Sequence, residues 1–212
     1  MITWMHIIDV GHTAVMVPVA GAIAAWLVLG RAWQLGIAWC LIFAAGLGVV
    51  AASKIAYLGW GLELPAIGFK AMSGHAWRTT AVLPVLLFVM LQHAPGHWRM
   101  RGALFGVALS VALGGLLVVF DFHTVSEVVA SLVLGIGAGI AFLRAAARLP
   151  PPAVQSWAVP VSLLSFLLIY SLKPSSMNHK LVDVALYFSG RDAPFRWHGN
   201  KLPLTPKVHN EC

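Results

Sequence analysis

A histidine at the start of an apolar segment offers the first group in this sequence that could do chemistry. His75 follows Ser73 and Gly74, and an apolar run begins there. Free N–H groups and the positive end of the helix dipole make such a helix start a binding site for an anion. The glycine lets a ligand approach the backbone, and the histidine exchanges a proton near neutral pH. We therefore expect an anion site at this helix start.

A second histidine, His123, stands four residues before Glu127, so both side chains could share one face of a helix. A carboxylate beside a histidine orients the ring and makes its other nitrogen a better base or nucleophile. Thr124-Val-Ser-Glu127 also fits a capping box, in which Glu127 accepts from the Thr124 N–H. The two roles are compatible, and the sequence leaves both open.

Three basic residues stand near these histidines in the sequence. Lys54 follows an apolar segment, Lys70 precedes His75 by five residues, and Arg78 follows His75 by about one helical turn. Each could neutralise an anion, or could extend to the headgroup level of a membrane, which is the more usual position for Lys70 and Arg78.

A metal or haem site at His75 and His123 would lack further ligands, so we expect no metal and no cofactor. The remaining histidines, including His12, show no ligand spacing. Cys40 lies in an apolar segment and Cys212 ends the chain, an arrangement that predicts neither a disulfide nor a metal site.

The composition is that of a membrane protein. Hydrophobic residues make up 59% of the 212 residues and charged residues only 10%, whereas about a quarter of the residues in soluble domains are charged. The net charge of +7 therefore concerns membrane orientation and anionic lipid, and we expect no nucleic-acid partner.

The apolar segments predict an all-α integral membrane bundle of about six transmembrane helices. We place the spans at residues 14–30, 35–53, 73–92, 102–120, 125–143 and 154–172. Because no basic residue precedes the first span, we expect it to be retained and not cleaved as a signal peptide. Glycine and proline interrupt residues 55–72, which predicts a loop or short interfacial helices. Residues 1–172 would form the membrane domain, and residues 173–212 a polar, irregular or amphipathic C-terminal tail.

The loop charges predict the orientation of the bundle. Five arginines fall on one side of the predicted spans, at Arg31, Arg99, Arg101, Arg144 and Arg148. The positive-inside rule makes that side cytoplasmic, so the histidines would face the opposite side, which is the periplasm if this is a bacterial inner membrane.

Small residues recur at four-residue spacing in two of the predicted spans, at Gly102, Gly106, Ser110 and Gly114, and at Gly135 and Gly139. Such spacing lets helices approach closely, and we favour packing within one bundle over a dimer interface. The oligomeric state stays open.

The chemistry-bearing residues resemble the type 2 phosphatidic acid phosphatase superfamily of membrane phosphatases. Its pattern has three parts: Lys, six residues, Arg-Pro; then Pro-Ser-Gly-His; then Ser-Arg, five residues, His, three residues, Asp. Here Lys54 stands in the first part, Met72-Ser-Gly-His75 in the second, and His123 with Glu127 in the third. The resemblance covers roughly residues 35–143, and the order, the spacing and the membrane side of the three parts agree.

The resemblance implies a phosphatase-like helical core and three catalytic roles. His123 would be the nucleophile that takes the phosphoryl group, Glu127 would orient it, and His75 would be the general acid. The resemblance further implies a phosphohistidine intermediate and a reaction that requires no metal.

The resemblance also implies how phosphate is held. Ser73 and the Gly74 N–H would bind phosphate oxygens, and Lys54 would neutralise them. Lys70 and Arg78 are the basic residues that could take the place of the family's arginines.

Both family arginines are missing, which makes the chain a divergent member of this pattern. Gly61 stands in place of the first arginine and Leu116-Leu117 in place of Ser-Arg, while Asp121 adds negative charge beside His123. One lysine does not easily replace a bidentate arginine.

Two functions are therefore expected. The first is a membrane lipid phosphate phosphatase, acting on an isoprenyl (pyro)phosphate or a phosphatidyl phosphate at the non-cytoplasmic face. The second is a non-catalytic phosphatase-like membrane protein that binds or transports a lipid or small ligand.

Overall fold

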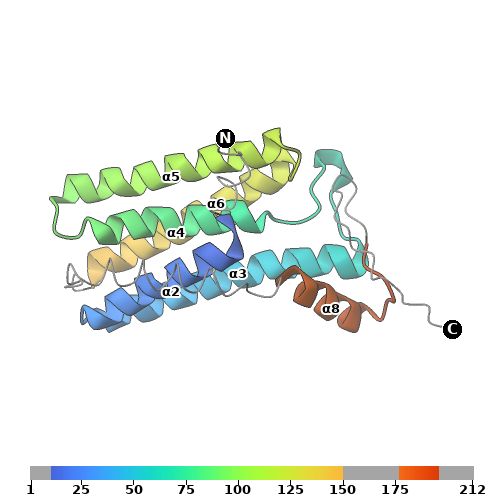
Figure 1. Ribbon diagram of the computed structural model, residues 1–212, viewed down its shortest axis with the longest axis horizontal. Helices are drawn as coiled ribbons and strands as arrows, with labels where there is room; N and C mark the ends of the chain where they lie inside the picture. Colours follow the sequence, from blue (N-terminus) through green and yellow to red (C-terminus); the bar gives the residue numbers. More distant parts are fainter. Residues whose placement is uncertain (1–10, 150–176, 196–212) are drawn as a thin grey trace, which may run out of the picture.

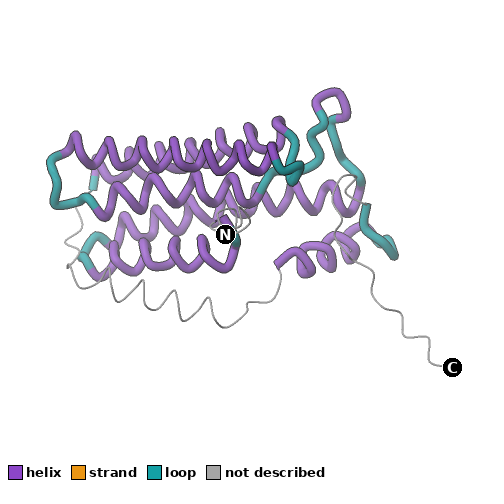
Figure 2. Tube along the Cα trace, turned by 45° about the horizontal axis from the view of Figure 1, so that its top comes forward, coloured by secondary structure: helices purple, strands orange, loops and turns teal. Residues whose placement is uncertain are grey.

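The computed structural model describes residues 11–149 and 177–195, and in these ranges the chain is helical apart from loops and turns. The long helices lie side by side, and consecutive helices run in opposite directions (Figures 1 and 2). Their bounds are Thr13–Leu29 (α2), Trp33–Trp60 (α3), Gly74–Met90 (α4), Gly96–Val119 (α5), Val125–Arg148 (α6) and Met177–Ser189 (α8). A short 3-10 helix, η2, spans Pro65–Ile67. The expected all-helical architecture is confirmed for this part of the chain.

Three helices, α3, α5 and α6, are long and apolar enough to cross a membrane. Helices α2 and α4 are also apolar but have only 17 residues each. Large apolar side chains on the outside of the three long helices are exposed, including Leu41, Phe105 and Val133. The described chain is thus an all-helical protein with the outer surface of a membrane protein. The sixth predicted span, residues 154–172, lies outside the described residues.

Three helix boundaries differ from the sequence prediction. Helix α3 does not stop at Ser53 but continues to Trp60, so Lys54 lies inside a helix and not at its end. Helix α5 begins at Gly96, six residues before the predicted Gly102. Helix α6 continues past the predicted Leu143 and ends at Arg148. The prediction was wrong because a charged side chain ends an apolar run without ending a helix. The end of α3 is instead set by Gly61, which adopts a left-handed φ of 68°.

Helix α4 is the centre of the bundle and packs against α2, α3, α5 and α6. Two glycines bring its neighbours close. A Cβ at Gly106 would lie 2.7 Å from the Pro84 nitrogen, and one at Gly135 would lie 2.6 Å from the Thr80 Cβ. Packing within the bundle, the alternative we favoured, is confirmed for these two small residues. Gly139 has no such neighbour within 4 Å.

The predicted C-terminal tail contains a helix that is attached to the bundle. Helix α8 packs beside the C-terminal end of α3 (Figure 1). A Cβ at Gly59 would lie 3.1 Å from the Ala185 carbonyl oxygen, and the Phe195 N–H donates to the Leu58 carbonyl at 3.0 Å. The loop from α3 to α4 and the turn before α6 lie at this same end of the bundle, whereas the five arginines of the orientation argument lie at the other end.

Candidate functional site

The start of α4 is fastened to α6 by a chain of hydrogen bonds. The Ser73 hydroxyl caps α4 by accepting from the Ala76 N–H at 3.4 Å. The Ser73 N–H donates to the Ser131 hydroxyl at 2.8 Å, and that hydroxyl donates to the Glu127 carbonyl at 2.6 Å. Ser73 is completely buried, so this structure uses it to shape the helix start.

His123 and Glu127 form the predicted pair. Nδ1 of His123 lies 2.7 Å from Oε2 of Glu127, whose side chain is completely buried. The same carboxylate accepts from the Lys70 N–H at 3.1 Å and from the Thr124 N–H at 3.3 Å. The Thr124 hydroxyl accepts from the Glu127 N–H at 3.4 Å, which completes the capping box. Glu127 therefore caps α6 and orients His123 at the same time, and Nε2 of His123 is directed away from the carboxylate.

The loop between α3 and α4 is tied to both flanking helices. The Met72 N–H donates to the Ser53 hydroxyl of α3 at 3.1 Å, and the Lys70 N–H donates to Glu127 of α6. Lys70 thus contributes its backbone to the site. These bonds bring the Ser-Gly-His turn beside His123, although the two segments are far apart in the sequence.

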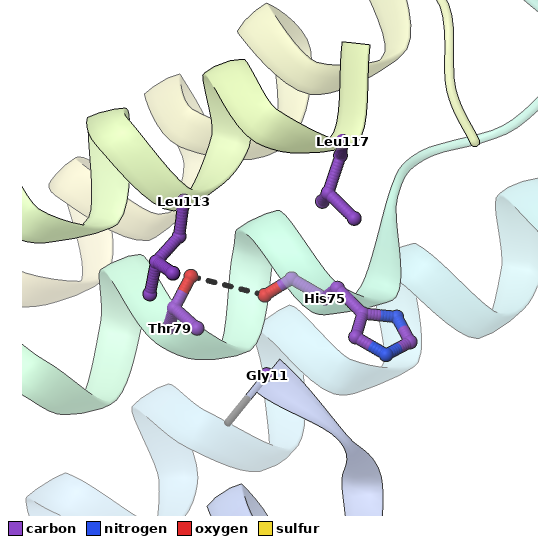
Figure 3. A pocket seen from close by; sticks show the side chains of 5 residues that line it. All are labelled: Gly11, His75, Thr79, Leu113 and Leu117. Carbon is purple, nitrogen blue, oxygen red and sulfur yellow. Dashed lines mark hydrogen bonds between the residues drawn. The ribbon is translucent and has the colours of Figure 1, made fainter. Parts of the chain in front are cut away.

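His75 lies half-buried on the first turn of α4, beside a cavity of about 10 Å³ (Figure 3). The cavity is lined by Gly11, His75, Thr79, Leu113 and Leu117. A cavity of this size has room for about one water molecule. The ring of His12 meets the His75 ring edge-on, with centroids 5.8 Å apart and planes at 68°. Among the described residues, nothing forms a hydrogen bond with the His75 ring.

Arg78 is buried below the start of α4, which corrects its expected position at the headgroup level. Only 6% of the residue is exposed, and Nε and Nη2 donate to the Gly11 carbonyl at 3.3 and 3.1 Å. Its Nη1 lies 2.8 Å from the place that a Cβ would take at Gly74. Side chains of a helix lean toward its N-terminus, and this direction brings the guanidinium under the first turn. Within residues 11–149 and 177–195, Arg78 has no carboxylate partner.

Lys54 joins this cluster from α3. It is half-buried and close enough to Arg78 and Glu127 for their charges to interact. His75 interacts electrostatically with Arg78, Lys54, His12 and His123. The structure therefore brings the predicted catalytic side chains and Lys54 and Arg78 to one end of the bundle, where Glu127 is the carboxylate in contact with His123.

Two N–H groups in the first turn of α4 make no hydrogen bond with a described residue, and Gly74 is buried. Gly74 and His75 occupy the first helical positions, and in the described part of the chain their N–H groups have no acceptor. A Cβ at position 74 would lie 2.8 Å from Nη1 of Arg78, so a larger residue there would displace the guanidinium. Two free N–H groups, the helix dipole and two cations form an arrangement suited to an oxyanion.

The positions of the two missing arginines differ in their surroundings. Gly61 has a left-handed backbone, and a Cβ there would lie 2.8 Å from the Phe195 ring, so an arginine is sterically excluded. Leu117 is buried and lines the cavity beside His75. That position does face the site, but it carries an apolar group. Asp121 is exposed in the turn before His123, with a φ of 57°.

The sequence analysis missed the turn formed by Gly11 and His12. The Gly11 carbonyl binds Arg78, and His12 both contacts His75 and caps α2 by accepting from the Ala14 N–H at 3.4 Å. A polar residue before an apolar run is a recognisable cap signal. No sequence pattern could reveal the contact with His75. Among the described residues, no group of three or more His, Cys, Asp or Glu side chains is placed to hold a metal.

Fold and site together define an all-helical protein with membrane-like helices and a two-histidine cluster at one end. The chain is 29% identical, over 201 residues, to an uncharacterized 22.5 kDa protein in the cps region of Klebsiella pneumoniae. The alignment covers 91% of this chain and 94% of that protein. No protein-family model and no solved structure matches the chain.

Proposed function

We propose that the protein is a membrane lipid phosphate phosphatase that acts through a phosphohistidine intermediate. The observation that carries the proposal is the 2.7 Å contact between His123 Nδ1 and the buried Glu127 carboxylate, beside the histidine-bearing start of α4. The substrate class is an isoprenyl (pyro)phosphate or a phosphatidyl phosphate. We also propose that the complete bundle has about six spans and a phosphatase-like core.

In the first step, Nε2 of His123 attacks the phosphorus atom in line with the leaving oxygen. The N–P bond forms as the bond from phosphorus to the lipid oxygen breaks, and His75 gives its proton to that oxygen. In the second step, a water oxygen attacks phosphorus and the N–P bond breaks, which restores Nε2 of His123. His75 takes a proton from the water, and orthophosphate leaves. Glu127 keeps the His123 ring in the same orientation through both steps.

Positive groups hold the phosphate oxygens while the bonds change. We assign this role to the Gly74 and His75 N–H groups, to Nη1 of Arg78 and to Lys54. Phosphoryl transfer depends mainly on such positioned charge around the equatorial oxygens. Arg78 lies one turn into α4, and its guanidinium reaches back to the first turn. It would supply the guanidinium that is missing at positions 61 and 117, where the family pattern has arginines.

The site would face away from the cytoplasm, because the five arginines cluster at the opposite ends of the helices. We place the protein in a bacterial inner membrane with the site toward the periplasm. The relative in the cps region of Klebsiella pneumoniae supports a bacterial setting.

Phosphate release in detergent tests the proposal. The substrates are a phosphatidate, an isoprenyl monophosphate and an isoprenyl diphosphate, and the proteins are wild type, His123→Ala and the control His97→Ala at the other end of the bundle. We expect His123→Ala to lower the rate by roughly a thousandfold or more, and His97→Ala to match wild type. An acid-labile phosphoenzyme should form in wild type and His97→Ala but not in His123→Ala. Equal rates for wild type and His123→Ala would exclude His123 as the nucleophile.

A second candidate function is non-catalytic binding or transport of a lipid or small anionic ligand. Gly61 and Leu117 favour it, because two guanidinium groups of the catalytic pattern are missing there. In that case the folded protein would bind phosphate or a lipid phosphate but release no phosphate from any of the three substrates.

A further inference from the structure

A short hairpin between α3 and α4, with η2 at its tip, projects from the site end of the bundle. We define it as residues 62–69, closed by Leu64 and Phe69. The Leu64 N–H donates to the Phe69 carbonyl at 2.7 Å, and the Phe69 N–H donates to the Leu64 carbonyl at 3.2 Å. The hairpin stands out beyond the ends of α4 and α5 (Figures 1 and 2).

The outer surface of the hairpin is apolar. Leu62, Leu64 and Ile67 are 63%, 58% and 60% exposed, and Trp60 just before them is 50% exposed. Glu63 is the one charged residue of the hairpin. Several large apolar side chains exposed together mark an interaction surface, and the absence of basic residues favours apolar insertion over electrostatic binding.

The position of the hairpin relative to α3 indicates that the surface covering it is the lipid bilayer. The 28 residues of α3 extend for about 42 Å, which exceeds the roughly 30 Å hydrocarbon core of a bilayer. The last turns of α3, ending at Trp60, therefore lie at the membrane interface. Helix α8 packs beside these turns and exposes Tyr187 and Phe188, and aromatic residues are typical of that interface.

The base of the hairpin is bound to the catalytic pair. The Thr124 hydroxyl donates to the Gly68 carbonyl at 3.0 Å, and the Lys70 N–H donates to the Glu127 carboxylate at 3.1 Å. A movement of the hairpin would therefore change the hydrogen bonds that position Glu127 and, through it, His123.

We propose that residues 62–69 insert into the boundary between headgroups and acyl chains of the bilayer that the protein occupies. This contact holds the Lys70–Glu127 hydrogen bond in place. Neither the contact of the hairpin with lipid nor the Lys70–Glu127 hydrogen bond requires phosphatase activity.

Site-directed fluorescence in lipid vesicles tests the insertion. A Cys40→Ser, Cys212→Ser protein carries a single Ile67→Cys labelled with an environment-sensitive dye, in phosphatidylcholine and phosphatidylglycerol vesicles. We expect strong quenching by lipid with a nitroxide near the headgroup and weak quenching by aqueous iodide. The matched control Glu63→Cys, on the same hairpin, should show the opposite order. Iodide quenching of both labels, without lipid quenching at Ile67, would overturn the proposal. So would a label shielded from both quenchers, as contact with a second copy would produce.

Hydrogen–deuterium exchange tests the coupling to the site. In vesicles, the double variant Leu64→Ser, Ile67→Ser should exchange the Lys70 amide about tenfold faster than wild type, because the local hydrogen bond opens more often. Amides in the middle of α4 should exchange at wild-type rates, which shows that the bundle is folded. Unchanged Lys70 exchange would contradict the coupling.

Discussion

The guanidinium of Arg78 is held by the carbonyl oxygen of Gly11, which lies 3.1 Å from Nη2 and 3.3 Å from Nε. This bond joins the segment before α2 to the first turn of α4. It leaves a positive charge buried beside the free Gly74 N–H. Burying a charge costs stability unless an opposite charge lies nearby, and no described carboxylate pairs with this guanidinium.

Replacing Arg78 by methionine should separate stability from anion binding. We expect Arg78→Met to leave the free energy of unfolding unchanged or raise it by up to about 2 kcal/mol, because it removes a buried charge that no described carboxylate neutralises. We expect orthovanadate at a hundred times its Kd to stabilise wild type by about 2.7 kcal/mol, and the variant to lose this stabilisation. Thermal unfolding in detergent, with and without orthovanadate, measures both effects.

The matched control for that prediction is Arg101→Met, whose guanidinium lies over the Trp98 ring at the opposite end of the bundle. This variant should keep the full orthovanadate effect. Wild-type stabilisation of Arg78→Met by orthovanadate would show that the guanidinium takes no part in binding anions.

Glu127→Gln should separate ring orientation from helix capping. Glutamine has one acceptor oxygen for the three donors that the carboxylate now serves, and its amide cannot accept from His123 Nδ1–H in the same way. We expect phosphate release to fall by on the order of a hundredfold or more. Thr124→Ala removes the cap hydroxyl but keeps the carboxylate, so it should cost about 1 kcal/mol of stability and lower phosphate release far less than Glu127→Gln. Similar losses of activity in the two variants would mean that Glu127 acts only as a cap.

His12 variants should show whether its ring positions His75. His12→Phe keeps an aromatic edge against His75, whereas His12→Asn keeps a cap acceptor for α2 and removes the ring. Because His75 has no hydrogen bond to its ring within the described residues, we expect His12→Asn to lower kcat roughly tenfold with little change in KM. His12→Phe should stay close to wild type. Equal loss in both variants, measured by steady-state kinetics, would show that the effect of His12 does not come from its ring edge against His75.

Gly46 should be required by the packing of α3 against α4. A Cβ at this position would lie 2.4 Å from the Trp77 ring, which is completely buried. Gly46→Ala should therefore destabilise the protein by about 1–3 kcal/mol. Gly48→Ala is the control in the same helix, because nothing lies within 4 Å of its Cβ position; its effect should stay within about 1 kcal/mol. Chemical or thermal unfolding of both variants in one detergent provides the comparison.

The sequence by itself determined the helical class, the general positions of five described helices and the two local motifs of the site. Apolar runs, caps and small-residue spacing are local patterns, so they are visible without a fold. The Ser73 cap and the Thr124–Glu127 capping box are of this kind, and both occur in the structure. Helix ends were less predictable, because Lys54 interrupts the apolar run of α3 but not its backbone hydrogen bonds.

Only the tertiary structure decided which side chains surround the two histidines. The burial of Arg78, its bond to Gly11, the ring contact of His12 with His75 and the inward position of Leu117 all join segments that are distant in the sequence. Such contacts depend on how α4 packs between α2, α5 and α6. That packing is set by the shapes of many side chains together, which leaves no periodic or local signal to read in the sequence.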